Sequence, residues 1–506
     1  MSHDESQKPN MALFWGCFIA LIATAFGFIV RAQILGEWQK PTEAGGFGLN
    51  PTQIGEIGGV GLWPFAISIV LFSMIIDKLG PKTVMLIGAI CHASSAVLTY
   101  TATGYQSLYW ATFICAIGNG TVESYINPVV ATMFSKDKTK WLNILHAGWP
   151  GGMVLGGIIA LSMGDVAWRV KVLLILIPTV IYVLLLIKQK FPASERSAAG
   201  VSYKEMLGEV GAIGAFIIFF LIGSELSRVI FKVEAPMTAG LWAGIGAAVA
   251  FFAFTKSLGK PLFILLLALM IPLATTELGV DSWVGELMGP AMGKWAPYIL
   301  IYTSAIMTVL RFFAGPIVGK LTPLGTLATC AAIASLGLVA LSQAEGASLI
   351  FVAATLYGIG KTFFWPTTLG VVAEQFPRGG AMTLNGVSGV GMLGVGILGS
   401  LFLGNIQEQT TDSELKSKDS ALHAKVMAEK SSLFGTYNSV DAEKLKAVSA
   451  DEQAKIKATA DGSKKIALKK VAIFPVLMLA TYLVLMLYFK SKGGYKPVDI
   501  NAGSGH

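Results

Sequence analysis

The chain has 506 residues, of which 54% are apolar and 13% charged, and its mean hydropathy is +0.65. Soluble domains carry about 25% charged residues, so this composition excludes a soluble protein and predicts a polytopic membrane protein. The formal charge of +8 comes mainly from Lys and Arg between apolar runs, where these residues set membrane orientation. It therefore does not indicate nucleic-acid binding.

In chain order, a polar tail of ten residues comes first. It lacks a basic region and a cleavage site, so the first apolar run is expected to be retained and not removed as a signal peptide. Fourteen runs of spanning length are predicted. They lie at 11–35, 52–76, 83–103, 107–134, 141–163, 168–188, 209–223, 236–256, 261–281, 295–318, 323–343, 347–374, 381–405 and 470–489.

These runs are arranged as six, two and six. The predicted domains are an N-terminal six-helix lobe at 1–190, a central linker with an inserted helix pair at 191–258, and a C-terminal six-helix lobe at 259–506. The basic residues between runs share one side with both termini, so the positive-inside rule predicts cytoplasmic termini in a plasma membrane, namely a bacterial inner membrane. The polar segment 406–469 is then an external loop, partly helical or disordered.

An internal repeat relates the two predicted lobes at one offset, 242 residues. Shared residues in this register span several runs and their connecting segments, which makes the repeat more informative than any single match. The matches include Ile117-Gly118 with Ile359-Gly360, Phe134 with Phe376, Leu142-Asn143 with Leu384-Asn385, and Lys78-Leu79 with Lys320-Leu321.

The segment after the second run reads Ser73-Met-Ile-Ile-Asp77-Lys78-Leu79-Gly80-Pro81-Lys82. It resembles the G-x-x-x-D-[RK]-x-G-x-[RK] signature of the major facilitator superfamily, with Ser73 at the first Gly position. The resemblance implies an all-α membrane protein with two pseudo-symmetric six-helix bundles, here plus two inserted helices. It also implies that Asp77, Lys78, Gly80 and Lys82 form a conformational gate. The alternative is that these charges only set orientation.

Two further segments are similar to the fucose/glucose/galactose permease group of this superfamily. Glu123-Ser-Tyr-Ile-Asn127-Pro128 has the spacing of its fourth span, where a Glu precedes Asn-Pro by four residues. The fifth-span motif Leu-Asn-Leu-Ala-Gln-x-x-Asn is matched only in part, because His146 replaces the Gln and Trp149 replaces the sugar-contacting Asn.

The group's acidic residue in the first span has no counterpart, since Arg31 and Gln33 occur in that region. The resemblance nevertheless implies sugar:proton symport, with Arg31, Gln33, His146 and Trp149 among the candidate substrate-binding residues. Arg31 can also bind a carboxylate or phosphate through two hydrogen bonds, or it can be an interfacial residue.

Glu123 is the candidate proton carrier on physical grounds. It lies roughly 24 Å along a helix from the start of its apolar run. Asn119, Glu123 and Asn127 recur every four residues, so one stripe carries all three and must face protein or water. Ionising a lone acid in low dielectric is costly, which allows it to cycle between protonated and ionised forms. The alternative is a carboxylate that is permanently hydrogen-bonded or ion-paired.

Lys361 and Trp365 complete the candidate site. Under the 242-residue offset they correspond to Asn119 and Glu123, so a pseudo-two-fold arrangement places them across one cavity from Glu123. Lys361 then forms a switching ion pair with Glu123 or a fixed pair elsewhere. Trp149 and Trp365 stack on a sugar ring or pack in the core.

Other polar residues in the runs are assigned packing or structural roles. His146 relays a proton or is a hydrogen-bonded residue at a helix end. His92, Glu277 and Arg311 are not assigned to the site. The four cysteines, Cys17, Cys91, Cys115 and Cys330, lack metal-ligand spacing, so we expect no metal and no cofactor.

The sequence therefore predicts a secondary active transporter that moves a small polar solute, a sugar or related polyol, together with a proton. The alternatives are an organic-anion transporter that uses Arg31 and Lys361, an uncoupled facilitator, and a transporter-like sensor. No nucleophile and base occur together, so an enzyme is not expected. The expected partners are a solute, a proton and the lipid bilayer, with the chain acting as a monomer.

Overall fold

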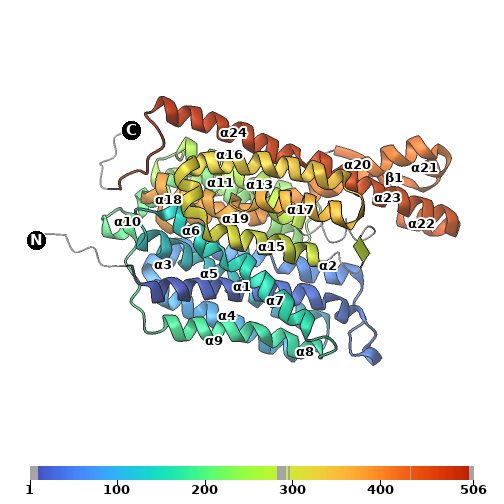
Figure 1. Cartoon of the computed structure of the whole chain (residues 1–506), viewed down its shortest axis with the longest axis horizontal. Coiled ribbons are helices and arrows are strands. Elements are labelled where there is room, and N and C mark those ends of the chain that lie inside the picture. The colour runs from blue at the N-terminus through green and yellow to red at the C-terminus, as the bar shows by residue number, and fades with distance from the viewer. Residues whose placement is uncertain (1–8, 282–291, 294–296, 433–434, 501–506) are drawn as a thin grey trace, which may run out of the picture.

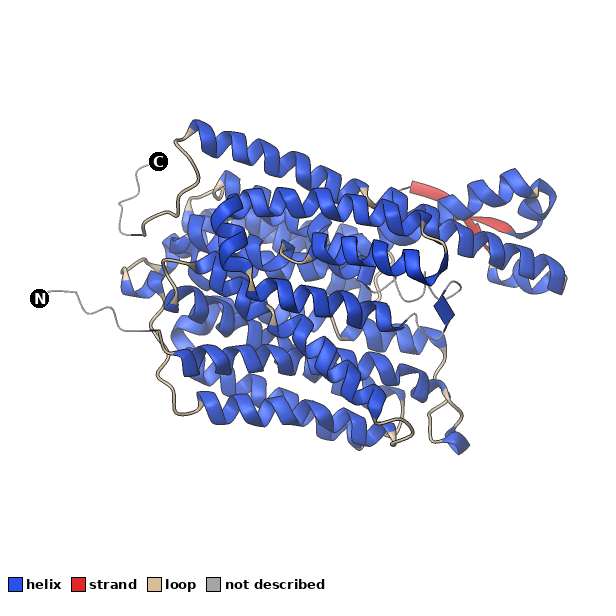
Figure 2. Ribbon diagram, in the orientation of Figure 1, coloured by secondary structure: helices blue, strands red, loops and turns tan. Residues whose placement is uncertain are grey.

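The computed structural model describes residues 9–281, 292–293, 297–432 and 435–500, which are mostly helical (Figure 1 and Figure 2). Most of the predicted tail and residues 295–296 of the run 295–318 lie outside these ranges. The α-helices are α1 Met11–Gln39, α2 Pro51–Val60, α3 Trp63–Leu79, α4 Pro81–Tyr100, α5 Tyr105–Met133, α6 Lys138–His146, α7 Gly148–Ser162, α8 Trp168–Lys171, α9 Leu176–Leu186, α10 Glu195–Ala198, α11 Tyr203–Val229, α12 Pro236–Thr255, α13 Pro261–Ala274, α15 Pro297–Phe312, α16 Ala314–Gln343, α17 Gly346–Lys361, α18 Phe364–Gln375, α19 Gly380–Gly394, α20 Ser400–Lys418, α21 Ser420–Val426, α22 Ala442–Ala447, α23 Ala450–Val471 and α24 Ile473–Ser491.

Helix ends follow the local sequence. The Asn10 side chain accepts a hydrogen bond of 3.1 Å from the Leu13 backbone N–H and caps α1. Between α3 and α4, Gly80 has a φ of +81°, which glycine adopts without a Cβ clash. Pro81 then occupies the first position of α4, where its missing N–H costs no helical bond.

Twelve helices in the described ranges are long and apolar enough to cross a membrane. The predicted count of fourteen is therefore not confirmed. The run 107–134 falls on the 29-residue helix α5, which is absent from the twelve. The run 295–318 contains the shorter apolar helix Tyr298–Phe312. The other twelve runs each fall on one of the twelve helices.

The long helices lie side by side, with both termini at one end of the molecule (Figure 1). We call this end, where α1 begins and α24 ends, the terminal end, and the opposite end, which carries residues 400–471, the loop end. Residues 1–190 and 259–506 are called the N-terminal and C-terminal halves, as names for these ranges. Most of the N-terminal half lies in the lower part of Figure 1 and most of the C-terminal half in the upper part.

The segment predicted as an external loop, 406–469, has a defined structure in its described residues. Helix α20 continues from α19 past the apolar run, and α23 leads into α24. Between them, strands β1 Met427–Ser432 and β2 Gly435–Val440 form an antiparallel hairpin. This hairpin is not predictable from the sequence pattern, because the segment is polar throughout and lacks the alternation of a half-buried strand.

The inserted pair is a helical hairpin formed by α11 and α12, and α11 packs on α19 and α13. The predicted run 209–223 is too short, because α11 extends over 27 residues. Gly211 has a φ of +61° and interrupts the helix. A Cβ atom there would lie 2.0 Å from the backbone nitrogen of Gly259, so this position requires glycine.

The two halves contact each other mainly along three helix pairs, with smaller contacts of α5 with α19 and of α6 with α15 and α16. Helix α3 packs on α19, α7 packs on α15, and α6 packs on α18. Each pair joins one helix before residue 190 to one after residue 259. The polar side chains described below lie mainly along these contacts.

Candidate functional site

Glu123 is 5% exposed, on α5, and the whole stripe of Asn119, Glu123 and Asn127 is buried in the protein. The Asn127 side-chain Nδ2 donates to the Glu123 carboxylate over 3.4 Å. Among the described residues no cation lies within ion-pair distance of Glu123. Glu123 is therefore a buried acid without a charge partner.

Asn127 links Glu123 to both halves. Its Nδ2 donates to Oδ1 of Asn385 over 3.0 Å, and its Oδ1 accepts a hydrogen bond of 3.0 Å from Nε2 of His146. Asn385 in turn donates to Oγ of Ser73 over 2.9 Å and to the backbone oxygen of Ser124 over 3.0 Å. All of these contacts are buried, so the polar stripe of α5 continues into α19 and α6.

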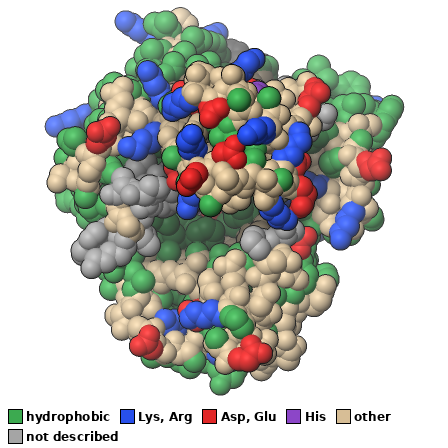
Figure 3. Space-filling view, turned by 90° about the vertical axis from the view of Figure 1, so that its right-hand side faces the viewer, with side chains coloured by type: hydrophobic (Ala, Val, Ile, Leu, Met, Phe, Trp, Pro, Cys, Tyr) green, Lys and Arg blue, Asp and Glu red, His purple; other side chains and the backbone are tan. Residues whose placement is uncertain are grey.

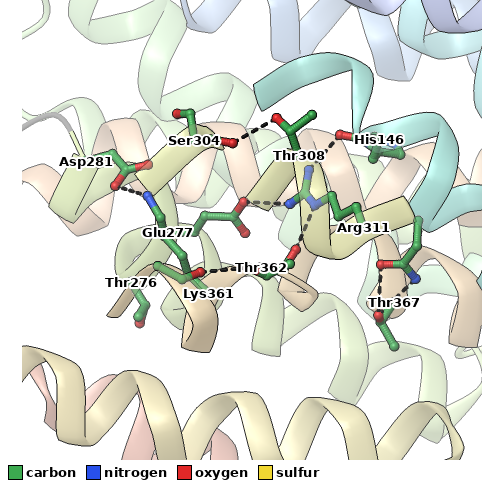
Figure 4. Close-up of polar contacts among 12 residues, drawn as sticks. His146, Thr276, Glu277, Asp281, Ser304, Thr308, Arg311, Lys361, Thr362 and Thr367 are labelled. Atoms are coloured by element: carbon green, nitrogen blue, oxygen red, sulfur yellow. Dashed lines mark hydrogen bonds and ion pairs between the residues drawn. The ribbon is translucent and has the colours of Figure 1, made fainter. Parts of the chain in front are cut away.

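Arg311 joins the same region to the C-terminal half (Figure 4). Its Nη1 donates to the backbone oxygen of His146 over 2.7 Å, and its Nε donates to the backbone oxygen of Thr362 over 2.7 Å. Its Nη2 forms an ion pair of 3.2 Å with Glu277, and both side chains are buried. Glu277 and Arg311 were not assigned to the site from the sequence; the fold places Arg311 in contact with His146, and Glu277 in contact with Arg311.

Lys361 forms an ion pair with Asp281, as Figure 4 shows. The Lys361 side chain is fully buried, and its Nζ lies 5.0 Å from the ring centroid of Tyr357. An ion pair between Lys361 and Glu123 is absent from the described contacts, and the fixed pair is the arrangement found. The available sequence signal was two charged or polar pairs at helical spacing inside apolar runs, Glu277 with Asp281 and Tyr357 with Lys361.

Arg31 points toward α4 in this structure. Its guanidinium donates to the Gly27 backbone oxygen at 3.0 Å and to the hydroxyls of Ser95 at 3.1 Å and Thr99 at 3.4 Å. Gln33 donates to the Gly157 backbone oxygen over 3.2 Å. Both residues thus contact their own half.

Asn119 contacts His92, which had been interpreted as packing. The His92 Nε2 and Asn119 Oδ1 atoms are 2.9 Å apart, and His92 Nδ1 lies 3.5 Å from the Tyr182 hydroxyl. His92 is fully buried, as packing implies, and it also has polar partners from α5 and α9, which are not visible as helical spacing along α4.

The two candidate tryptophans contact other apolar groups. The Trp149 ring lies 6.0 Å from the Phe28 ring, and Trp365 is buried against Gly391. Packing of this kind was the alternative to sugar stacking for both residues. Their roles as substrate contacts stay predictions.

The four residues predicted as a gate lie at the terminal end. Asp77 forms an ion pair with Arg196 on α10, and Oγ of Ser194 donates to the Asp77 carboxylate over 3.0 Å. The Lys78 Nζ lies 5.4 Å from the centroid of the Tyr203 ring. Gly80 forms the turn described above, and Lys82 is exposed. Asp77 and Lys78 therefore hold the linker between the halves.

Hydrogen bonds close the halves against each other at the terminal end. The start of α6 reaches α18, where Thr139 donates to Glu374 over 2.5 Å and Lys138 donates to the Ala373 backbone oxygen over 3.2 Å. The C-terminal tail packs against the same carboxylate from within its own half, because Tyr495 donates to Glu374 over 2.7 Å. Figure 3 shows that the loop end, in contrast, is hollowed between an upper and a lower part, with hydrophobic side chains lining the hollow.

No group of three or more His, Cys, Asp or Glu residues in the described ranges could hold a metal ion. The cysteines Cys17, Cys91, Cys115 and Cys330 are free thiols. What the site contains is a buried acid, amides, one histidine and two ion pairs.

A model of the Major Facilitator Superfamily matches residues 11–401. The chain belongs to the Major Facilitator Superfamily. This confirms the family predicted from Asp77-Lys78-Leu79-Gly80 and from the internal repeat. No significant match to a curated protein was found by sequence.

Solved structures of the Major Facilitator Superfamily share its fold with this chain. A variant of the Escherichia coli fucose:proton symporter FucP has a TM-score of 0.57 and 15% identity, covering 93% of this chain and 99% of its own. The proton:xylose symporter XylE has a TM-score of 0.61 and 12% identity, covering 95% of each chain. The human organic anion transporter MFSD10 has a TM-score of 0.58 and 12% identity, covering 94% of this chain and all of its own.

Membership of the superfamily supports a transporter and not an enzyme. Within its fold, the contacts of α3 with α19, of α6 with α18 and of α7 with α15 are the main places where the two halves meet. Glu123 is linked to α19 through Asn127, which bonds both Glu123 and Asn385. Arg311 on α15 contacts α6 through the backbone oxygen of His146.

Proposed function

We propose that this chain carries a sugar or related polyol by proton-coupled alternating access, with Glu123 as the proton carrier. The observation that supports this most directly is the burial of Glu123 without a cation among the described residues. A carboxylate in low dielectric without a charge partner favours its protonated form. Contact with water or a change of partners then favours release of the proton.

The neighbouring acids do not suit this role equally well. Glu277 is paired with Arg311 and Asp281 with Lys361, and protonating either one would leave a buried cation uncompensated. Glu123 can gain a proton without that cost. The proton therefore binds at Glu123 while the two ion pairs keep their charges.

A small polar solute fits the surroundings of Glu123. Asn127, His146 and Asn385 present amide and imidazole groups, which pair with hydroxyl groups once the closed contacts open. In this proposal a solute enters from the hollow at the loop end (Figure 3). The titles of two structural neighbours name fucose:proton and proton:xylose symporters, and these support a sugar as the first solute to test.

The organic-anion alternative is favoured by one neighbour, the human organic anion transporter MFSD10. The two cations that it requires are less available, because Arg31 already has three hydrogen bonds and Lys361 has an ion pair. An anion would have to displace these partners. A sugar also displaces hydrogen bonds, those among Asn127, His146 and Asn385, but it breaks no ion pair.

The finer architecture and setting belong to the same proposal. Two six-helix lobes, 1–190 and 259–506, rock about the solute with the helix pair of 191–258 between them. The chain acts as a monomer in a bacterial inner membrane, with both termini in the cytoplasm. Asp77, Lys78, Gly80 and Lys82 gate the cytoplasmic side.

Purified protein in proteoliposomes tests the proton role. The solute is first identified by a thermal-shift screen over sugars, sugar acids, nucleosides and carboxylates. We expect Glu123→Gln to abolish accumulation driven by a pH gradient while solute exchange persists, because the variant is permanently neutral. Glu345→Gln, at an exposed position, should behave as wild type. Undiminished pH-driven accumulation by Glu123→Gln would show that Glu123 is not the carrier.

A further inference from the structure

Three prolines in the helices of the site deprive backbone oxygens of their helical donors. A proline has no N–H, so the oxygen of the residue four positions earlier loses its hydrogen bond. Pro128, Pro150 and Pro366 leave the oxygens of Ser124, His146 and Thr362 in this state. In a membrane such an oxygen must find another donor, because no water is available to supply one.

Side chains donate hydrogen bonds to all three of these oxygens, and the donors belong to two residues, Asn385 and Arg311. Asn385 donates to Ser124 O over 3.0 Å. Arg311 donates to His146 O and to Thr362 O, each over 2.7 Å. Two of these three bonds, those to Ser124 and His146, run from the C-terminal half to the N-terminal half. Two of the backbone oxygens that the prolines free are therefore acceptors for hydrogen bonds between the halves.

Arg311 has two partners in its own half and one in the opposite half. Thr362 and Glu277 belong to its own half, so these two contacts move with it when the halves separate. The bond to His146 O is the one that must break. Separation therefore costs Arg311 a single hydrogen bond, while its charge stays paired with Glu277.

Glu277 can accept a hydrogen bond from Nη1 of Arg311 when that group leaves His146 O. Its ion pair with Arg311 uses Oε1 at 3.2 Å, longer than the roughly 2.7–2.9 Å of a tight pair. Its buried Oε2 has no hydrogen-bond partner among the described residues. When Nη1 of Arg311 leaves His146 O, Oε2 can accept it and complete a two-bond pair.

We propose that Arg311 is a two-position switch between the halves. In the conformation described, Nη1 bonds the carbonyl that Pro150 frees in the N-terminal half. In the opposite conformation it bonds Oε2 of Glu277 in its own half. Both positions satisfy the guanidinium, which is how a buried charge can take part in a large rearrangement. Arg311 is in this sense a positioning residue, because it acts on the interface and not on the solute.

Pulsed electron paramagnetic resonance on the full chain in nanodiscs tests this switch. Spin labels on Lys136→Cys and Lys320→Cys, both exposed, report the distance between the halves. The native cysteines are replaced beforehand. We expect Arg311→Gln to shift the equilibrium away from the closed terminal end by about tenfold, the typical contribution of one hydrogen bond to a charged group.

Pro150→Ala is the more selective variant, because it restores an N–H to His146 O and leaves Arg311 and Glu277 paired. It should shift the equilibrium in the same direction as Arg311→Gln. The double variant should shift no further than either single variant, since both remove the same bond. Pro272→Ala is the control, because no side chain donates to Ala268 O in the contacts of the described residues.

An additive double variant, or a Pro150→Ala equilibrium equal to that of wild type, would overturn the proposal. The distance measurement needs neither solute nor a proton gradient. A failure of the Arg311 switch is therefore distinguishable from a failure of Glu123 as the proton carrier.

Discussion

The side chain of Asn385 donates to the backbone oxygen of Ser124 over 3.0 Å, although the two residues lie 261 positions apart in the chain. Pro128 frees that oxygen, and Asn385 also reaches Asn127, the hydrogen-bond partner of Glu123. One buried amide therefore joins the candidate proton carrier to the opposite half.

Replacing Asn385 should destabilise the protein. Asn385→Ala leaves the Ser124 oxygen and the Asn127 amide without this partner, and we expect the free energy of unfolding to fall by about 1–3 kcal/mol. The measurement is thermal unfolding in detergent. Ser388→Ala on the same helix is the control, because the buried Ser388 hydroxyl has no partner among the described residues. Equal losses in both variants would contradict the role of the amide.

Replacing one member of the ion pair between Lys361 and Asp281 should destabilise the protein more than replacing both members. Lys361→Met leaves Asp281 without its cation, and the expected loss is about 3–5 kcal/mol. The double variant Lys361→Met with Asp281→Asn should recover much of that loss, because no buried charge remains unpaired. Lys40→Gln, whose partner Glu37 is exposed, should change the unfolding temperature little. A double variant as unstable as Lys361→Met would refute this expectation.

Asp77→Asn should loosen the linker. The carboxylate holds Arg196 and Ser194, so its loss should increase amide hydrogen exchange in residues 191–202, measured by mass spectrometry. We expect several-fold faster exchange there, because the neutral amide binds the guanidinium less strongly. Lys82→Gln, at an exposed position of the same loop, should leave exchange in 191–202 unchanged. Equal exchange in both variants would argue for charges that only set orientation.

Glu452 in the loop-end segment should titrate at low pH. Hydrogen bonds to the Glu452 carboxylate from Lys425 and from the backbone N–H and hydroxyl of Ser449, at the start of α23, lower the pKa of Glu452 from 4.5 to about 2. A lowered pKa means that its contribution to stability is present above pH 4.5 and is lost as the pH falls toward 2. Carbon NMR of 13C-labelled Glu carboxyl groups measures the midpoint, and Lys425→Gln should raise it. A midpoint near 4.5 in the unmodified chain would contradict the contact.

The sequence by itself determined the class, the family and the part of α5 that carries the candidate proton site. Composition required a membrane protein, the Asp77 motif indicated the superfamily, and the four-residue spacing of Asn119, Glu123 and Asn127 required a stripe that faces protein or water. These conclusions rest on local chemistry, because periodicity and hydropathy are properties of neighbouring residues.

Only the tertiary structure decided which charges and donors meet. The cost of a charge in an apolar run predicts that Glu277, Asp281, Arg311 and Lys361 have partners, but four charges allow more than one pairing. Helix packing between residues 34 and 80 positions apart selected Glu277 with Arg311 and Asp281 with Lys361. A proline in a helix likewise predicts, from the sequence alone, a backbone oxygen without its helical donor. The side chain that donates to this oxygen comes from another helix and is determined by the way the helices pack.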